Sequence, residues 1–219
     1  MPLAASDPIT DALSSFAEAL ETPVHALALV LLLVLALELG RGGVEAWRRM
    51  RRGRGRLVDV ATTALREPQR GRELARDVAS PIAGRALERM ADAVGTGDPR
   101  GSEPALAEYE LAVQRRLDRT RVLVRAGPAV GLMGTLIPLA PGIASLGEGD
   151  IAGLASDLRT AFAATVVGIL VGTTSFVLTL WRTRMYTEDL TALEQAVAAL
   201  DADGRAPRRI TETVGEHAT

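Results

Sequence analysis

Two threonines are the residues of this sequence best placed to do chemistry in an apolar environment. Thr135 lies in an uncharged run of residues 126–146, and Thr165 lies in a second uncharged run of residues 160–181. A threonine hydroxyl both donates and accepts hydrogen bonds, which suits it to hold a water chain or to line the path of a carboxylate. The alternative is that each hydroxyl bonds to the carbonyl of its own helix four residues earlier.

Other kinds of chemistry find little support in the sequence. The absence of cysteine removes disulfides, thiolate metal sites and cysteine nucleophiles together. The two histidines, His25 and His217, complete neither a metal-binding cluster nor a Ser/His/Asp set. Gly127, Gly131 and Gly134 lie in an apolar run that no strand precedes, so we interpret them as packing residues and not as a phosphate loop. The sequence therefore predicts no enzyme, no cofactor and no metal site.

The elements that position the threonines are predicted to be membrane-spanning helices. The two uncharged runs contain 21 and 22 residues, and a helix needs about 20 apolar residues to cross the hydrocarbon core. A third, shorter run begins at Val24, after Thr22 and Pro23, which form a plausible N-cap and first helical position. We therefore predict spans over residues 24–40, 122–146 and 158–181.

Small and hydroxyl residues recur on one face of each of the last two spans. In the last span, steps of three and four residues separate Ala161, Thr165, Gly168, Gly172, Ser175 and Thr179. The opposite face carries Phe162, Val166, Ile169, Val177 and Leu180. The preceding span has a matching row at Pro128, Gly131, Thr135, Pro138 and Gly142. Small residues let helices pack closely in lipid, so these two faces predict a packed membrane bundle.

The arginines predict the orientation of the spans. Residues 41–56 contain seven arginines, residues 111–125 contain five, and two more follow the last span, whereas the opposite ends hold only Arg159. The positive-inside rule therefore predicts an external N-terminus and a cytoplasmic C-terminus. Because these arginines flank spans and the formal net charge is only −2, we interpret them as topological signals and expect no nucleic-acid partner.

The remaining segments follow from this topology. Residues 1–23 are predicted to form a short amphipathic helix on the outer membrane surface or, alternatively, a polar leader. Residues 41–121 form a cytoplasmic insertion, interpreted as a helical hairpin with one helix bent at Pro81 and another starting at Pro104 and continuing into the second span. Residues 147–157 form an outer loop. Residues 182–219 continue the last helix and end in a loose tail. A seam of Leu190, Leu193, Val197 and Leu200 is expected to pack on the insertion or on neighbouring subunits.

Two sequence runs resemble signatures of the MotA/TolQ/ExbB proton channel family. The run GPAVGLMGTL, at residues 127–136, resembles the family's G-P/A-x-L-G-L-L-G-T-V signature. The run AFAATVVGIL, at residues 161–170, resembles its A-L-x-A-T-x-x-G-L signature in the last span. The resemblance implies a homo-oligomer, a pentamer, around a single-span partner of the ExbD/TolR/MotB type that carries a transmembrane aspartate. It also implies that Thr135 and Thr165 line the ion path.

The chain departs from this family pattern at one position. ExbB and TolQ proteins place a glutamate five residues before the last-span threonine, where this chain has Thr160, with Asp157 one turn outward. MotA-type stators also lack that glutamate. Since no ionisable residue lies deep in a span, any conducting carboxylate must come from the partner.

Together these patterns predict an all-α fold: a three-span membrane helix bundle with long helices extending into the cytoplasm. The predicted function is that of an ion channel subunit, with the proton as the favoured ion, in an energy-transducing inner-membrane complex. The alternatives are a nonconducting membrane scaffold and, less favoured, a membrane-bound enzyme subunit. The predicted ion-path residues are Thr135, Thr165 and Thr160, and the predicted helix-packing residues are Gly127, Gly131, Gly134, Gly168 and Gly172.

Overall fold

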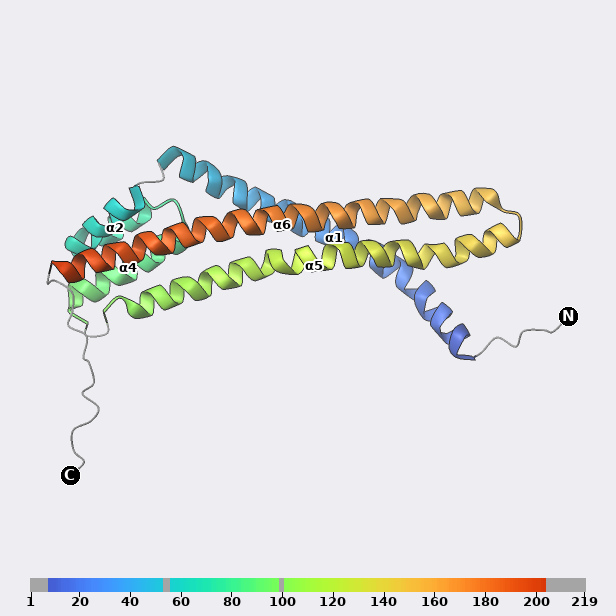
Figure 1. Cartoon of the computed structure of the whole chain (residues 1–219), viewed down its shortest axis with the longest axis horizontal. Helices are drawn as coiled ribbons and strands as arrows, with labels where there is room; N and C mark the ends of the chain where they lie inside the picture. Colours follow the sequence, from blue (N-terminus) through green and yellow to red (C-terminus); the bar gives the residue numbers. More distant parts are fainter. Residues whose placement is uncertain (1–7, 53–55, 99–100, 204–219) are drawn as a thin grey trace, which may run out of the picture. The chain divides into compact units, whose positions relative to one another are not determined.

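A computed structural model describes residues 8–52, 56–98 and 101–203 of the chain. These residues form α-helices and no strand, as the sequence predicts. The helices are α1 (Pro8–Arg52), α2 (Arg56–Arg66), α3 (Pro68–Arg76), α4 (Pro81–Thr96), α5 (Glu103–Gly147) and α6 (Ile151–Ala202) (Figure 1). Three of them, α1, α5 and α6, are long and apolar enough to cross a membrane.

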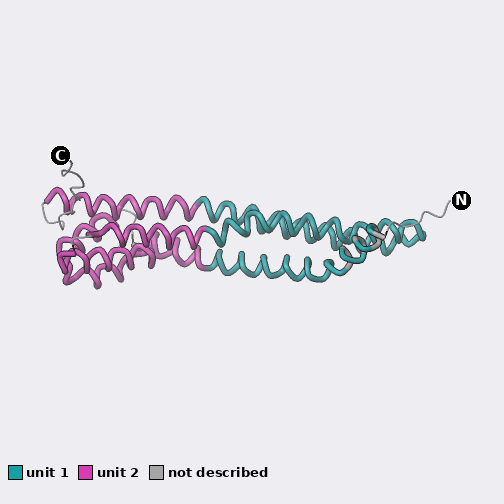
Figure 2. The backbone as a smooth tube through the Cα atoms, turned by 90° about the horizontal axis from the view of Figure 1, so that it is seen from below, with its two compact units in different colours: residues 1–40, 118–180 teal, residues 41–117, 181–219 magenta. Residues whose placement is uncertain are grey.

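The chain divides into two compact units, coloured separately in Figure 2. Unit 1 contains residues 1–40 and 118–180, and unit 2 contains residues 41–117 and 181–219. Helices α1, α5 and α6 each contribute a segment to both units, whereas α2, α3 and α4 belong to unit 2 alone.

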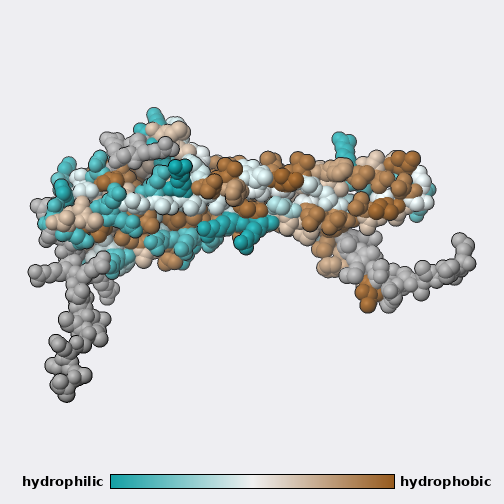
Figure 3. Space-filling model, in the orientation of Figure 1, coloured by the Kyte–Doolittle hydropathy of each residue, from teal (hydrophilic) through white to brown (hydrophobic). Residues whose placement is uncertain are grey.

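Unit 1 exposes most of its large apolar side chains. Among them are Leu29, Leu33, Leu132, Leu136, Phe162, Val166, Phe176 and Leu180, and brown, apolar atoms cover much of the corresponding part of Figure 3. A much smaller buried cluster joins Val24, Ala28, Leu31 and Leu35 of α1 to residues of α5 and α6. An outer surface of this composition fits a hydrocarbon solvent, so the three-span interpretation is supported.

Unit 2 has a conventional buried core. Helices α2, α3 and α4 supply most of it, with Leu65, Leu87 and Met90 fully buried. The beginning of α5 adds Ala105 and Tyr109, and the end of α6 adds Leu193, Ala196 and Leu200. The predicted seam on α6 therefore packs on the helices of the insertion.

The start of the first span differs from the prediction. Pro23 was expected at the first position of a helix, with Thr22 as its cap, but it lies inside α1. A proline within a helix removes one N–H and with it the bond to the carbonyl four residues earlier, which a long helix tolerates. Residues 8–23 are helical, as expected, but they continue without a break into the first span. Their position on a membrane surface stays a prediction, and residues 1–7 lie outside the described part.

The insertion also differs from the predicted hairpin. The expected helix bent at Pro81 is two helices, α3 and α4, because the chain is extended at Ser80, where φ is −92° and ψ is 118°. A residue before proline avoids the helical region, and the Ser80 Oγ accepts a hydrogen bond from the Ala83 N–H at 3.4 Å, capping α4. The prediction for Pro104 is confirmed: α5 begins at Glu103 and continues unbroken to Gly147.

Candidate functional site

Within unit 1, α5 and α6 meet backbone to backbone along a glycine seam formed by Gly127, Gly131, Gly168 and Gly172. A Cβ atom built on Gly127 would lie 2.7 Å from the Gly168 carbonyl oxygen, and one on Gly168 would lie 2.7 Å from the Gly131 Cα. A Cβ on Gly172 would lie 2.8 Å from the Pro128 ring. No residue larger than glycine fits these positions without moving a helix or a proline ring.

The close contact between α5 and α6 continues at Gly134, one helical turn after Gly131 in α5. A Cβ there would lie 2.6 Å from the Cβ of Ala164 and 3.8 Å from a methyl carbon of Val24 in α1. Helix–helix contacts thus form at all five glycines that were predicted to be packing residues: Gly127, Gly131, Gly134, Gly168 and Gly172.

The two faces of α6 in unit 1 have opposite surroundings. Ala161, Gly168, Gly172 and Ser175 are buried, whereas the Phe162 and Val177 side chains on the other face are each 64% exposed. The small-residue stripe therefore lies against α5, and the large apolar side chains face outward.

The hydroxyl groups of the three candidate threonines donate hydrogen bonds to different kinds of partner. The Thr165 hydroxyl donates across the helix pair to the Gly131 carbonyl at 3.4 Å. The Thr135 hydroxyl donates to the Leu132 carbonyl at 2.7 Å, and the Thr160 hydroxyl donates to the Ser156 carbonyl at 3.2 Å, each within its own helix. Thr135 thus bonds within its own helix, three residues back and not four as in the alternative, whereas Thr165 bonds across to α5.

Two ionisable side chains of unit 1, Asp157 and His25, lie at or next to the beginning of an apolar run. Asp157 packs against α5: a Cβ built on Gly142 would lie 3.5 Å from its Oδ2 atom. His25 Nδ1 donates to the Glu21 carbonyl at 2.8 Å, and its buried Nε2 has no hydrogen-bond partner among the described residues. No group of three or more His, Cys, Asp or Glu side chains suitable for a metal ion occurs in the described residues.

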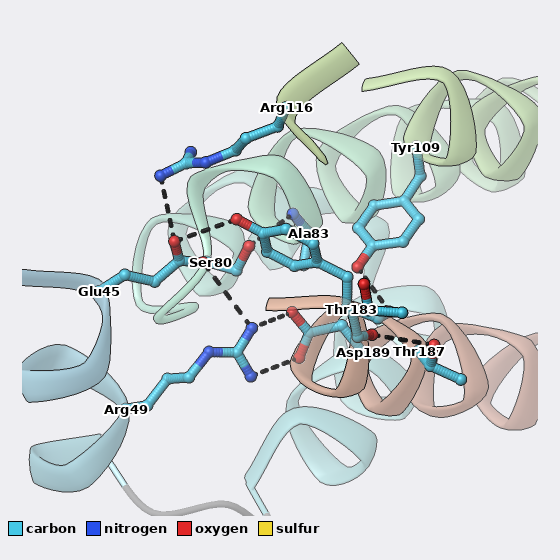
Figure 4. Close-up of polar contacts among 10 residues, drawn as sticks. Glu45, Arg49, Ser80, Ala83, Tyr109, Arg116, Thr183, Thr187 and Asp189 are labelled. Atoms are coloured by element: carbon cyan, nitrogen blue, oxygen red, sulfur yellow. Dashed lines mark hydrogen bonds and ion pairs between the residues drawn. The ribbon is translucent and has the colours of Figure 1, made fainter. Parts of the chain in front are cut away.

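Unit 2 holds a second polar site, a buried cluster that joins α1, α5 and α6 (Figure 4). Arg49 forms a two-pronged ion pair with Asp189, one contact being 2.9 Å from Nη1 to Oδ1. The Glu45 carboxylate accepts hydrogen bonds from Arg116 at 3.1 Å and from the Tyr186 hydroxyl at 3.2 Å.

A tyrosine extends the buried cluster to the beginning of α5. The Tyr109 hydroxyl donates to the Tyr186 carbonyl at 2.9 Å. Burial raises the pKa of the Tyr109 and Tyr186 hydroxyls, so both remain neutral donors at physiological pH. Burial also raises the pKa of the Asp189 carboxyl, against the ion pair with Arg49, which lowers it.

The buried cluster was not apparent from the sequence. Glu45 and Arg49 lie in the arginine-rich flank that was interpreted as a topological signal. One indication was available: Glu45 and Arg49 are four residues apart, on one helix face, in a segment where most other charges are arginine. Nothing local indicated Asp189 as the third member, because 140 residues separate it from Arg49.

Comparison with known proteins agrees with the motifs that form the glycine seam. The model of the MotA/TolQ/ExbB proton channel family matches residues 76–214, well over half of the chain. No curated protein and no solved structure matches the chain. The matched region includes both signature runs, and thus Thr135, Thr165 and the glycine seam. The chain therefore belongs to the MotA/TolQ/ExbB proton channel family.

Proposed function

We propose that this chain is the channel-forming subunit of a proton-driven, energy-transducing membrane complex. Its family and its three apolar helices support a multi-pass membrane protein with an ion-channel or energy-transducing role. The observation that carries this proposal is the hydrogen bond from the Thr165 hydroxyl across the glycine seam to the Gly131 carbonyl. This bond is a polar contact between two apolar helices. Residues 126–146 of one helix and residues 160–181 of the other contain no charged side chain.

In this proposal Thr165, Thr135 and Thr160 line the ion path of the assembled complex. Each hydroxyl now donates to a backbone carbonyl, and each can still accept a hydrogen bond from water or from a protonated carboxyl group. The 3.4 Å bond of Thr165 is long for an O–H donor, so its exchange for a shorter bond to such a partner costs little.

The ion-carrying carboxylate is supplied by a partner. An ionisable group inside a membrane is costly and usually functional, and the uncharged runs provide none. We infer a single-span partner of the ExbD/TolR/MotB type with a transmembrane aspartate. Each proton that crosses about 100 mV releases roughly 2.3 kcal/mol, enough to change a few noncovalent contacts between the partner and this chain.

The assembly is proposed to be a homo-pentamer around the partner's helices, embedded in lipid. The exposed apolar side chains of unit 1 provide the surface for lipid and for neighbouring copies. The distribution of arginines supports an external N-terminus and a cytoplasmic C-terminus. In this proposal unit 2 lies in the cytoplasm.

A specific observation favours the alternative of a nonconducting scaffold. Thr135 and Thr160 bond only to carbonyls of their own helices, and Thr160 occupies the position where ExbB and TolQ proteins have a glutamate. In a scaffold the glycine seam alone would matter, and the hydroxyls would be dispensable.

Thr165→Val separates the two functions, with Thr173→Val as the matched control. Thr173 is on the same helix, is exposed, and bonds only to its own helix, at Ile169. The complex, purified through a tag on this chain, is reconstituted in liposomes, and proton flux is measured under a membrane potential. We expect Thr165→Val to reduce flux about tenfold or more, because it removes the partly buried hydroxyl that is proposed to line the ion path, with assembly intact and the control unchanged. Equal flux in both variants and the wild type would rule out the channel in favour of the scaffold.

A further inference from the structure

A cavity in unit 2 has no place in the proposed ion path. It lies between α4 and the beginning of α5, has a volume of about 450 Å³, and is lined by three arginines, Arg85, Arg89 and Arg115, together with Glu108 and Tyr109. The rest of its lining is apolar, mostly small alanine side chains from both helices. Cavities of about 300–1,000 Å³ with an apolar lining and a few convergent polar groups are typical of small-molecule sites.

The charges of this cavity favour an anion. Arg89 forms an ion pair with Glu108, so their charges offset each other. The Arg85 Nε donates to the Pro81 carbonyl of its own helix at 3.3 Å, and neither Arg85 nor Arg115 forms an ion pair within the described part of the chain. Two exposed guanidinium groups that form no ion pair with the described residues thus line this open cavity. Their combined charge matches that of a phosphate monoester, about −1.5 to −2 at neutral pH.

The position of the cavity along the sequence favours a soluble ligand over a lipid headgroup. Arg115 precedes residue 122, where the predicted span begins, by seven residues of the continuous helix α5, or about 10 Å of helix length. Tyr109 lies about 10 Å further along the same helix. The headgroup layer on each side of the hydrocarbon is only about 5–8 Å thick, which favours a soluble occupant.

We propose that this cavity binds a soluble organic phosphate of about mononucleotide size. Arg85 and Arg115 hold the phosphate, since guanidinium groups bind phosphate oxygens in a two-pronged geometry. The alanine-lined floor contacts the organic part of the ligand. Inorganic phosphate alone leaves that floor uncovered and binds more weakly.

The site has a direct link to the buried cluster of unit 2. Tyr109 lines the cavity, and its hydroxyl donates to the Tyr186 carbonyl, next to the Glu45–Arg116 pair. A ligand that displaces the Tyr109 ring therefore acts on a hydrogen bond that holds α5 to α6 within this unit.

The test is calorimetric titration of the full-length protein in nanodiscs of zwitterionic lipid, with ADP, pyrophosphate and inorganic phosphate as probes. We expect ADP to bind more tightly than inorganic phosphate. Arg85→Gln and Arg115→Gln should each weaken ADP binding about tenfold or more, because each removes charge-assisted hydrogen bonds. The control is Arg184→Gln, whose side chain is 85% exposed in unit 2 away from the cavity lining, and it should bind like the wild type.

Three results would overturn the proposal. The first is no heat of binding with any of the three probes. The second is an equal loss of affinity in Arg184→Gln, which would indicate nonspecific attraction to arginine. The third is complete loss of ADP binding when the nanodiscs contain anionic phospholipid, which would identify a membrane lipid as the occupant. None of these readouts depends on ion conduction. The proposed ligand site can therefore be wrong while the proposed channel function is right, and the reverse.

Discussion

Gly168→Ala tests the glycine seam most directly. The added methyl carbon would lie 2.6 Å from the Gly127 carbonyl oxygen and 2.7 Å from the Gly131 Cα. Comfortable contact between carbon atoms is about 3.5–4.0 Å, so α5 and α6 would have to separate by about 1 Å at this point. Since the obstructing atoms are backbone, no change of rotamer can relieve the overlap.

The expected cost of this substitution follows from two opposing terms. Overpacking of a closely packed site costs about 1–3 kcal/mol, and an immovable obstacle favours the upper part of that range. Alanine in place of glycine in a helix returns about 1 kcal/mol at most. The net expectation is a loss of about 1–2 kcal/mol, which lowers the ratio of folded to unfolded protein roughly 5- to 30-fold.

Gly40→Ala is the matched control, because only the helix term operates there. Gly40 lies in α1 within the same unit, and a Cβ built on it has no atom within 4 Å. It should therefore stabilise the protein by up to about 1 kcal/mol. Unfolding in mild detergent, titrated with a denaturing detergent and followed by circular dichroism, measures both variants. If Gly168→Ala matches Gly40→Ala in stability, the backbone contact is absent and the reasoning fails.

Three further predictions concern the buried cluster of unit 2, all measured by thermal unfolding. Tyr109→Phe should cost about 1 kcal/mol, because it removes the 2.9 Å bond to the Tyr186 carbonyl. Arg49→Gln should cost about 3 kcal/mol or more, since it leaves Asp189 buried without its cation, whereas Arg49→Met with Asp189→Leu should be nearly neutral. The third prediction concerns pH. A carboxyl whose pKa is raised on folding adds stability at low pH that is lost as pH rises through the folded-state pKa. The stability of the wild type relative to Asp189→Asn should therefore increase as pH falls from the raised pKa toward the ordinary value of 3.8.

Each of these predictions has an outcome that contradicts it. An unchanged melting temperature in Tyr109→Phe would mean that water replaces the hydroxyl and that the site is open. Equal losses in Arg49→Gln and in the double apolar variant would mean that packing, not charge, holds the pair. A stability difference between the wild type and Asp189→Asn that does not vary with pH would place Asp189 in solvent.

The faces of the last span were predictable because one physical rule governs them. Lipid gives helices no hydrophobic reason to associate, so the face that packs is the one where small residues allow close approach. Spacing alone therefore separates Gly168 and Gly172, which are buried, from Phe162 and Val177, which are exposed. The break before α4 could also be predicted. Serine followed by proline is an N-cap and first helical position, but it was interpreted as a bend.

The difference between Thr135 and Thr165 could not be predicted from the sequence. Both are threonines in apolar spans with the same two options for the hydroxyl. What separates them is how closely α5 approaches α6 at Gly131, a matter of tenths of an ångström that residue types do not encode. The Arg49–Asp189 ion pair could not be predicted from the sequence for another reason. Its members lie 140 residues apart, and an isolated arginine next to a span satisfies the topological rule without any partner.

The glycine seam has a mechanical consequence. Helices held together by interlocking side chains must lift over one another to shift, whereas Gly127, Gly131, Gly168 and Gly172 present no side chains to interlock. Fixing glycine in place also costs no side-chain entropy, so two helices that meet through these residues can lie backbone to backbone without loss of rotamer freedom.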